Sequence, residues 1–113
     1  MPAKAGIHSV GRVGMSAVTR RPCVYILASR RNGTLYVGVT SDVVRRILEH
    51  KTDAVDGFTK KYCVHLLVYY EFHETMPDVI LREKQMKGWN RAWKIEMIQR
   101  FNPQWQDLYN DIV

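Results

Sequence analysis

The chain has 113 residues, of which 46% are hydrophobic and 25% are charged, and this composition is typical of one folded domain rather than of a disordered chain. Two cysteines are too few for a disulfide-rich secreted scaffold, and no apolar run is long enough to cross a bilayer. Seventeen lysines and arginines against eleven acidic residues give a net charge of +6, which permits a polyanionic partner such as nucleic acid.

Most of this net charge lies in the first 21 residues, which contain no acidic side chain. Their basic residues are Lys4, Arg12, Arg20 and Arg21. We predict a flexible basic arm over residues 1–21 and a folded domain over residues 22–113. The arm lacks the apolar region and the cleavage site of a secretory signal. A role in organelle targeting stays open, as does a translation start at Met15, which would leave residues 1–14 untranslated.

Two segments rich in β-formers, residues 23–29 and 34–40, flank Asn32-Gly33, a dipeptide that strongly indicates a β-hairpin. If these two residues are the whole turn, Tyr25 and Tyr36 lie on the same face of the sheet, because opposed residues project to one side. The opposed pairs in that register are Ser29–Tyr36, Leu27–Gly38 and Tyr25–Thr40. Any even-length loop keeps both tyrosines on one face but changes their separation. The glycine in the second strand predicts a bulge or a close approach to the backbone.

Helices are predicted to surround a third strand. Ser41-Asp42 can cap a helix over about residues 42–51, and a polar loop follows over residues 52–61. Residues 62–72 form the third strand, which we expect to be the central one because its middle is continuously apolar. The predicted fold class is therefore α+β, a small three-stranded, mostly antiparallel sheet flanked by helices in the order β-β-α-β-α-α.

Two helices complete the domain. Pro77-Asp78 fits the first turn of one that runs to about Lys87, and Asn90 can cap another that ends at Asn102-Pro103. The residues expected on the buried face of the last helix are Trp93, Met97, Ile98 and Phe101. Those expected to pack the tail are Trp105, Leu108 and Tyr109. We expect the tryptophans to serve the core rather than to stack bases, and Cys23 and Cys63 to be buried thiols.

Two tripeptides and the helix after them carry a resemblance to a known family. Val24-Tyr25-Ile26, Tyr36-Val37-Gly38, Asp42 and Arg46 resemble the motifs of the GIY-YIG endonuclease superfamily, in particular its small stand-alone bacterial members. The eleven-residue step from Tyr25 to Tyr36 and the ten-residue step from Tyr36 to Arg46 agree with that family. The likeness extends through residues 82–85 and 102–105, so it covers nearly all of the chain except the arm.

The resemblance implies metal-dependent hydrolysis of DNA phosphodiester bonds, structure-directed cleavage in repair or recombination included. It implies Glu83 as the ligand of one Mg²⁺ or Mn²⁺, and Arg46 as the group that stabilises charge on the phosphate. Tyr25 and Tyr36 are the candidates for the general base, and the choice between them stays open. His50 could relay a proton. The residues expected to support the site are Gly38 and Asn102.

Each of these residues also has a purely structural interpretation. A strand tyrosine commonly packs, Arg46 can pair with Asp42 or Glu49, and Glu83 can be a solvated surface charge. Because position 24 is not glycine and Val39 stands where several active members have lysine, the alternative function is a weak or inactive nucleic-acid-binding or interaction module. The expected partners are DNA, branched or damaged DNA included, and a protein that directs targeting, with no membrane and an open oligomeric state. The expected location is the bacterial cytoplasm, with association to the nucleoid when DNA is bound.

Overall fold

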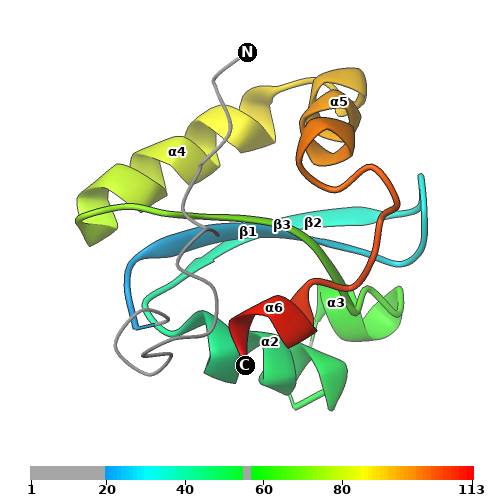
Figure 1. The fold of residues 1–113 in the computed structure, drawn as a ribbon, viewed down its shortest axis with the longest axis horizontal. Coiled ribbons are helices and arrows are strands. Elements are labelled where there is room, and N and C mark those ends of the chain that lie inside the picture. The colour runs from blue at the N-terminus through cyan, green and yellow to red at the C-terminus, as the bar shows by residue number, and fades with distance from the viewer. Residues whose placement is uncertain (1–19, 55–56) are drawn as a thin grey trace.

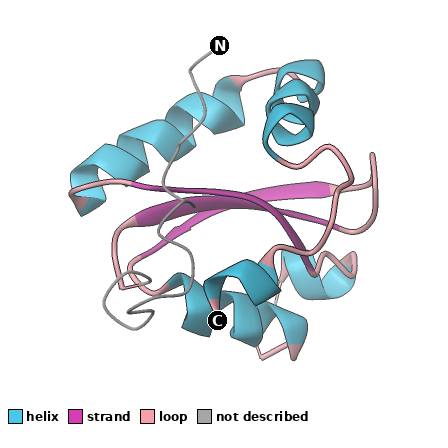
Figure 2. Ribbon diagram, in the orientation of Figure 1, coloured by secondary structure: helices cyan, strands magenta, loops and turns pink. Residues whose placement is uncertain are grey.

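The computed structural model describes residues 20–54 and 57–113, and it confirms the predicted α+β class and the antiparallel sheet (Figures 1 and 2). Almost all of the predicted arm, residues 1–19, lies outside the described residues. The elements in chain order are β1 (Cys23–Ala28), β2 (Leu35–Thr40), α2 (Val43–Lys51), α3 (Phe58–Lys61), β3 (Leu66–Phe72), α4 (Met76–Gly88), α5 (Arg91–Phe101) and α6 (Tyr109–Ile112). None of the helices in the described part of the chain is long and apolar enough to span a membrane.

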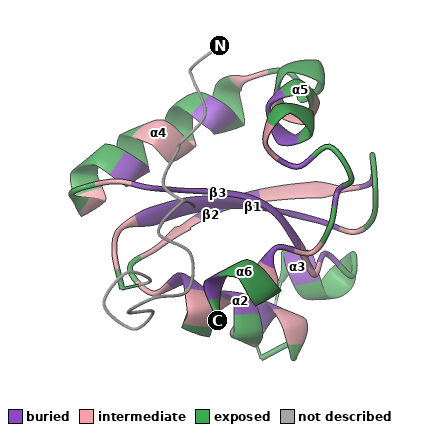
Figure 3. Cartoon of the chain, viewed as in Figure 1, coloured by how far each residue is buried: buried purple, intermediate pink, exposed green. Residues whose placement is uncertain are grey.

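The sheet lies between two layers of helices. Helices α2, α3 and α6 cover one face, and α4 and α5 cover the other (Figure 1). Strand β1 is buried along its whole length because it contributes to both cores (Figure 3). Its residues Tyr25 and Leu27 belong to the core under α2, and Val24 and Ile26 belong to the core under α4. The period-2 alternation of a strand therefore separates the two cores.

The strand order is β2-β1-β3, so the prediction that the third strand is central is wrong. The strand also begins at Leu66 rather than at Tyr62, and α3 occupies part of the predicted polar loop. A continuous apolar run indicates that both faces of a strand are covered, here by helices. It does not indicate whether another strand pairs with each of its two edges. Strand β1 has the same property and is the one in the middle.

The outer edge of β3 is covered by the C-terminal tail. Asp107 Oδ1 accepts a hydrogen bond from the Leu67 N–H (3.2 Å), and the Leu108 N–H donates to the Leu67 carbonyl (2.7 Å). Asn102 Nδ2 donates to the Val68 carbonyl (3.3 Å). These bonds satisfy backbone groups that an edge strand would otherwise leave open to another chain.

The hairpin turn is wider than predicted. The Ser29 N–H donates to the Thr34 carbonyl (3.0 Å), so four residues form the loop and the two-residue turn is wrong. Tyr36 therefore lies opposite Leu27, and Tyr25 lies opposite Gly38, but both tyrosines still share one face because the loop length is even. The opposed pairs in the observed register bring Tyr36 two residues closer to Tyr25 than predicted.

A contact from a distant helix favours the wider loop. Arg91 at the start of α5 donates through Nη2 to the carbonyls of Asn32 (2.7 Å) and Gly33 (2.6 Å). The Ser29 hydroxyl also accepts a hydrogen bond from the Thr34 N–H (2.9 Å). The dipeptide correctly located the turn, and both a local contact and a distant one accompany its greater length.

The predicted helix starts are confirmed, whereas two burial predictions are wrong. Asp42 and Asn90 accept N-capping hydrogen bonds at α2 and α5, and Pro77 lies in the first turn of α4. Trp93 is 52% exposed rather than buried, and the buried residues of α5 are Met97 and Ile98. Cys63 is exposed because it lies in the turn after α3 instead of in a strand. Trp105 is buried, as expected of a core residue.

Replacing Asp107 tests the covering of the β3 edge. Asp107→Ala leaves the Leu67 N–H without its acceptor and removes the ion pair with Lys51, so we expect a loss of about 1–3 kcal/mol in the free energy of unfolding. Urea denaturation measures this loss. The matched control is Glu96→Ala, which removes an exposed ion pair with Arg100 and should cost less than about 1 kcal/mol. Equal effects of the two substitutions would contradict the prediction.

Candidate active site

Three buried polar side chains form a hydrogen-bonded chain between β1, α2 and α3. The Tyr25 hydroxyl lies 3.0 Å from His50 Nε2, and His50 Nδ1 lies 2.9 Å from Thr59 Oγ1. No more than 3% of any of the three residues is exposed. Tyr25 projects from β1 toward α2, and His50 meets it from the last turn of α2. We call this arrangement the Tyr25–His50–Thr59 chain.

Burial sets the protonation of this chain. It raises the pKa of Tyr25 and lowers the pKa of His50, because a buried site disfavours the charged form of either group. The nearby Arg46 guanidinium lowers the pKa of His50 further. Tyr25 is therefore a neutral phenol beside a neutral imidazole, and the ring nitrogen that carries the proton sets the direction of both hydrogen bonds.

Thr59 is a residue that sequence reasoning missed. It lies in the segment predicted to be a polar loop, among other polar residues, and nothing in its local sequence distinguishes it. It meets His50 only because the chain reverses after α2 and forms α3 against the same face of the sheet.

Tyr36 lies beside this chain on the same face. Its ring centroid is 6.4 Å from that of Tyr25 and 5.6 Å from that of His50. Gly38 makes room for the pair, since a Cβ there would lie 2.6 Å from both Cζ and Oη of Tyr25. The close approach expected at Gly38 is thus the contact of the Tyr25 ring with the Gly38 backbone, which carries no side chain. Tyr25 is almost fully buried and Tyr36 is only partly buried, so Tyr36 is the more accessible phenol.

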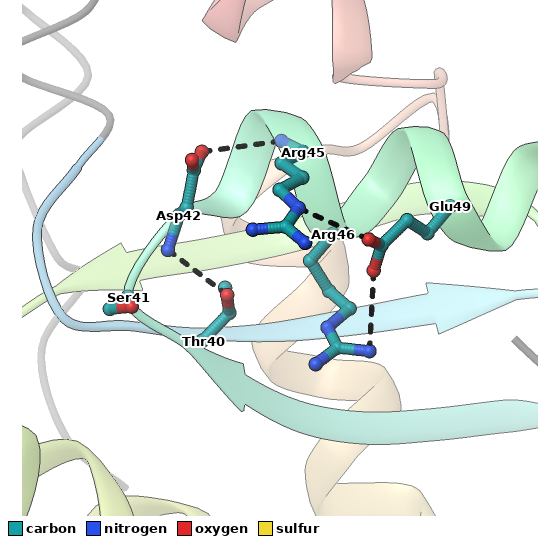
Figure 4. Close-up of a pocket in the computed structure, with 6 residues that line it drawn as sticks. All are labelled: Thr40, Ser41, Asp42, Arg45, Arg46 and Glu49. Carbon is teal, nitrogen blue, oxygen red and sulfur yellow. Dashed lines mark hydrogen bonds and ion pairs between the residues drawn. The ribbon is translucent and has the colours of Figure 1, made fainter.

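Arg46 lines a small pocket at the start of α2 with Arg45, and Glu49 lies between the two guanidinium groups (Figure 4). Glu49 contacts Arg45 Nε at 3.2 Å and Arg46 Nη1 at 3.4 Å. Of the two structural partners expected for Arg46, Glu49 is the one observed. Asp42 instead caps α2 by accepting from the Arg45 N–H at 3.3 Å. The Arg46 side chain is 40% exposed, so an incoming anion can compete with Glu49 for it.

Comparisons with known proteins identify the family of this chain. Residues 21–96 match the model of the GIY-YIG catalytic domain. The chain belongs to the GIY-YIG family. Among its GIY-YIG relatives are UPF0213 proteins of Staphylococcus epidermidis, 34% identical over 76 residues, and Staphylococcus aureus, 35% identical over 77 residues. Each alignment covers 67% of this chain and 92% of the relative. No solved structure gives a significant match.

GIY-YIG nucleases generally use a divalent metal ion, and Glu83 is the carboxylate predicted to bind one. Glu83 lies on α4, on the opposite face of the sheet from α2, and its carboxylate pairs with Lys87 Nζ at 3.2 Å. Burial is the main cause of the raised pKa of Tyr25, and the charge of Glu83 contributes less than Tyr36, Arg46 or Cys23. Within residues 20–54 and 57–113, no cluster of three or more His, Cys, Asp or Glu side chains could hold a metal. A single carboxylate still suits Mg²⁺, which commonly takes one or two carboxylates, waters and substrate phosphate oxygens.

A buried ion pair anchors α4 next to Glu83. Arg82 Nε donates to Glu71 Oε2 of β3 at 2.5 Å, and the Arg82 guanidinium lies over the Trp89 ring. Glu71 also accepts hydrogen bonds from the Tyr69 hydroxyl and from His73, which helps to keep its pKa below the usual range after burial has raised it. The contact links α4 to β3 at the position next to Glu83.

Asn102 is not brought to the tyrosines by its observed contacts. Its Nδ2 donates hydrogen bonds to the Val68 and Gln106 carbonyls, and its Oδ1 accepts one from the Gln106 N–H. All three contacts lie at the β3 side of the sheet. Strand β1 separates β3 from β2, which carries Tyr36. These contacts explain Asn102 as an attachment point for the tail, and a supporting role in the site stays a prediction.

Replacing Gly38 tests the packing of Tyr25. Gly38→Ala places a methyl group against the buried Tyr25 ring, so we expect a loss of about 1–3 kcal/mol in the free energy of unfolding and displacement of the phenol from His50. Urea denaturation measures the first effect and the His50 NMR signals report the second. Gly88→Ala is the control, because a Cβ at Gly88 meets no atom within 4 Å. An unchanged Gly38→Ala protein would contradict the close contact.

The lowered pKa of His50 predicts an acid-sensitive contribution to stability. The pKa of His50 is lower in the folded protein than its ordinary value of about 6.5 in the unfolded chain, so the unfolded state binds the proton more strongly. The stabilisation that neutral His50 provides is therefore complete above pH 6.5 and is lost as the pH falls below that value. His50→Gln should remove this part of the pH dependence. The test compares urea denaturation of both proteins from pH 8 to pH 5, with His65→Gln as the control because His65 pairs with Asp53 near the surface. A constant difference between wild type and His50→Gln across this range would refute the prediction.

Proposed function

We propose that this GIY-YIG protein is a metal-dependent endonuclease that hydrolyses DNA phosphodiester bonds. The observation that carries the proposal is a phenol hydrogen-bonded to a neutral imidazole at 3.0 Å, with Tyr36 and Arg46 beside it. A packing tyrosine does not require a buried, neutral histidine as its acceptor. The arrangement is chemically suited to accept a proton at neutral pH.

The proposed proton path begins at Tyr25. In water activation, the Tyr25 oxygen accepts a proton from the attacking water while its own proton moves to His50 Nε2. His50 is a suitable acceptor because it is neutral, and Thr59 holds its other nitrogen in the required tautomer. Glu49 favours the positive charge then formed on the imidazole, and Arg46 opposes it with the larger effect until a bound phosphate offsets the guanidinium charge. Tyr36, the more accessible phenol, orients the water and the phosphate.

Arg46 binds the phosphate in this proposal. Its guanidinium is always charged and matches two phosphate oxygens, so it stabilises negative charge that develops during cleavage. In the free protein it is paired with Glu49, and substrate binding replaces that exposed pair. Glu83 is the proposed ligand of one Mg²⁺ or Mn²⁺, which would supply Lewis-acid polarisation of the phosphate.

The substrate is proposed to be DNA, branched or damaged DNA included, with a role in repair or recombination. The protein is expected in the cytoplasm and on the nucleoid when bound to DNA. A second protein that supplies targeting is compatible with the small size of the chain. The alternative is a module that binds nucleic acid without cleaving it, and the following experiment separates the two.

The proposed activity is tested with duplex, single-stranded and branched DNA in the presence of Mg²⁺ or Mn²⁺. We expect nicking that EDTA abolishes and that falls at least about 100-fold in Tyr25→Phe, Arg46→Ala and Glu83→Gln, because general-base, charge-stabilising and metal-binding groups each contribute on that order. Arg45→Ala is the matched control, since Arg45 lies on the same helix and shares the Glu49 contact. Binding without cleavage of any substrate would overturn the enzyme proposal and favour the binding module.

A further inference from the structure

A groove crosses the free edge of β2, outside the residues already assigned a role except for Tyr36. It has a volume of about 310 Å³, and its lining residues are Leu35, Tyr36, Val37, Phe58, Lys87 and Lys94. Phe58 comes from α3 on one face of the sheet, and the two lysines come from α4 and α5 on the other (Figure 1). The volume is at the lower end of the range of about 300–1000 Å³ for small-ligand sites.

Exposed aromatic rings extend from this groove. Phe58 is 46% exposed and lies nearly parallel to Tyr36, with ring centroids 6.2 Å apart and an interplanar angle of 28°. Tyr62 is 47% exposed and lies 4.8 Å from Phe58. Two neighbouring aromatic side chains left half in solvent, next to a ring of the candidate site, provide apolar faces on which a planar group can stack.

Positive charge accompanies the aromatic rings. Lys87 and Lys94 line the groove, and Lys61 Nζ lies 5.4 Å from the centre of the Tyr62 ring. Lys87 is paired with Glu83, but its side chain is 54% exposed, so a phosphate can compete with that carboxylate for it. Aromatic faces combined with lysines favour a ligand that is planar and apolar on its faces and anionic along its backbone, which describes a nucleotide in a single strand.

We infer that this groove binds an unpaired base of the DNA substrate, which stacks on Phe58 while Lys87 and Lys94 contact the adjacent phosphates. The inference rests on the proposed function for the identity of the polymer. A base within a duplex is already stacked on both sides and must leave the helix to reach Phe58, at a cost in unstacking energy. The site therefore directs the protein toward single strands and toward duplexes with an unpaired nucleotide next to the cleaved phosphate.

Equilibrium binding in EDTA tests the site without any cleavage. A fluorescein-labelled 12-nucleotide single strand is compared with a set in which each base in turn is removed to leave an abasic sugar. For the wild type we expect one abasic position to weaken binding by about tenfold, the order of one stacked base. Phe58→Leu should weaken binding of the intact strand by a similar factor and make that same position insensitive to base removal.

Matched variants separate stacking from general loss of affinity. Trp93→Leu removes an equally exposed aromatic ring outside the groove and should bind as the wild type does. Phe58→Trp keeps a stacking face and should retain both the affinity and the sensitive position. Lys94→Ala should reduce the salt dependence of binding, whereas Lys84→Ala, exposed on α4 away from the groove, should not.

A blunt duplex should bind more weakly than the same duplex with one bulged nucleotide.

The outcomes distinguish this site from the proposed activity. Four results would each overturn the base site. Two concern Phe58→Leu: unchanged binding, or an abasic effect that persists. The other two are an equal loss of affinity in Trp93→Leu and no measurable binding of the single strand. Cleavage that continues in such a case would leave the proposed nuclease function in place. Conversely, coupling between Phe58 and one base in a protein that cleaves no substrate would support the site and refute the nuclease.

Discussion

The burial of β1 on both faces is the constraint on which the rest of the structure depends. A strand covered by helices on each side must place alternate residues in two separate cores. Among the residues of β1, Tyr25 is the one that brings a hydroxyl group into its core. Its buried hydroxyl needs a hydrogen-bond partner, and His50 provides one. The position of α2, and through Thr59 that of α3, is consistent with that one requirement.

The two edges of the sheet have different neighbours, and the proposed sites lie at one of them. The edge of β3 is occupied by the tail through Asn102, Asp107 and Leu108. At the edge of β2 lies the groove that residues from both helical layers line. Groups from opposite faces can meet only around a sheet edge, so the proposed joint action of Glu83 on α4 with the tyrosines that face α2 requires this edge. The proposed base site lies along the same edge, where an extended polyanion has access.

The local sequence was sufficient for much of the fold. Capping residues correctly located the starts of α2 and α5, Asn32-Gly33 located the hairpin, and alternation predicted that Tyr25 and Tyr36 share a face. These features depend on neighbours within a few residues along the chain. The wrong predictions involve distant contacts: Arg91 favours the wider turn, and helices on both faces make β3 as apolar as the central strand. Trp93 and Cys63 are exposed for the same reason, because burial depends on what packs against them.

By itself, the sequence determined the α+β class, the family motifs and the candidates Tyr25, Tyr36, Arg46, His50 and Glu83. Only the tertiary structure decided how they are arranged: that Tyr25 is buried against Gly38 and bonded to His50, that Thr59 orients this histidine, that Glu49 holds Arg46, and that Asn102 serves the tail. Motif spacing specifies which residues are present and on which element they lie. Protonation, pairing and accessibility depend on groups that are remote in the sequence, and those are placed only when the chain packs.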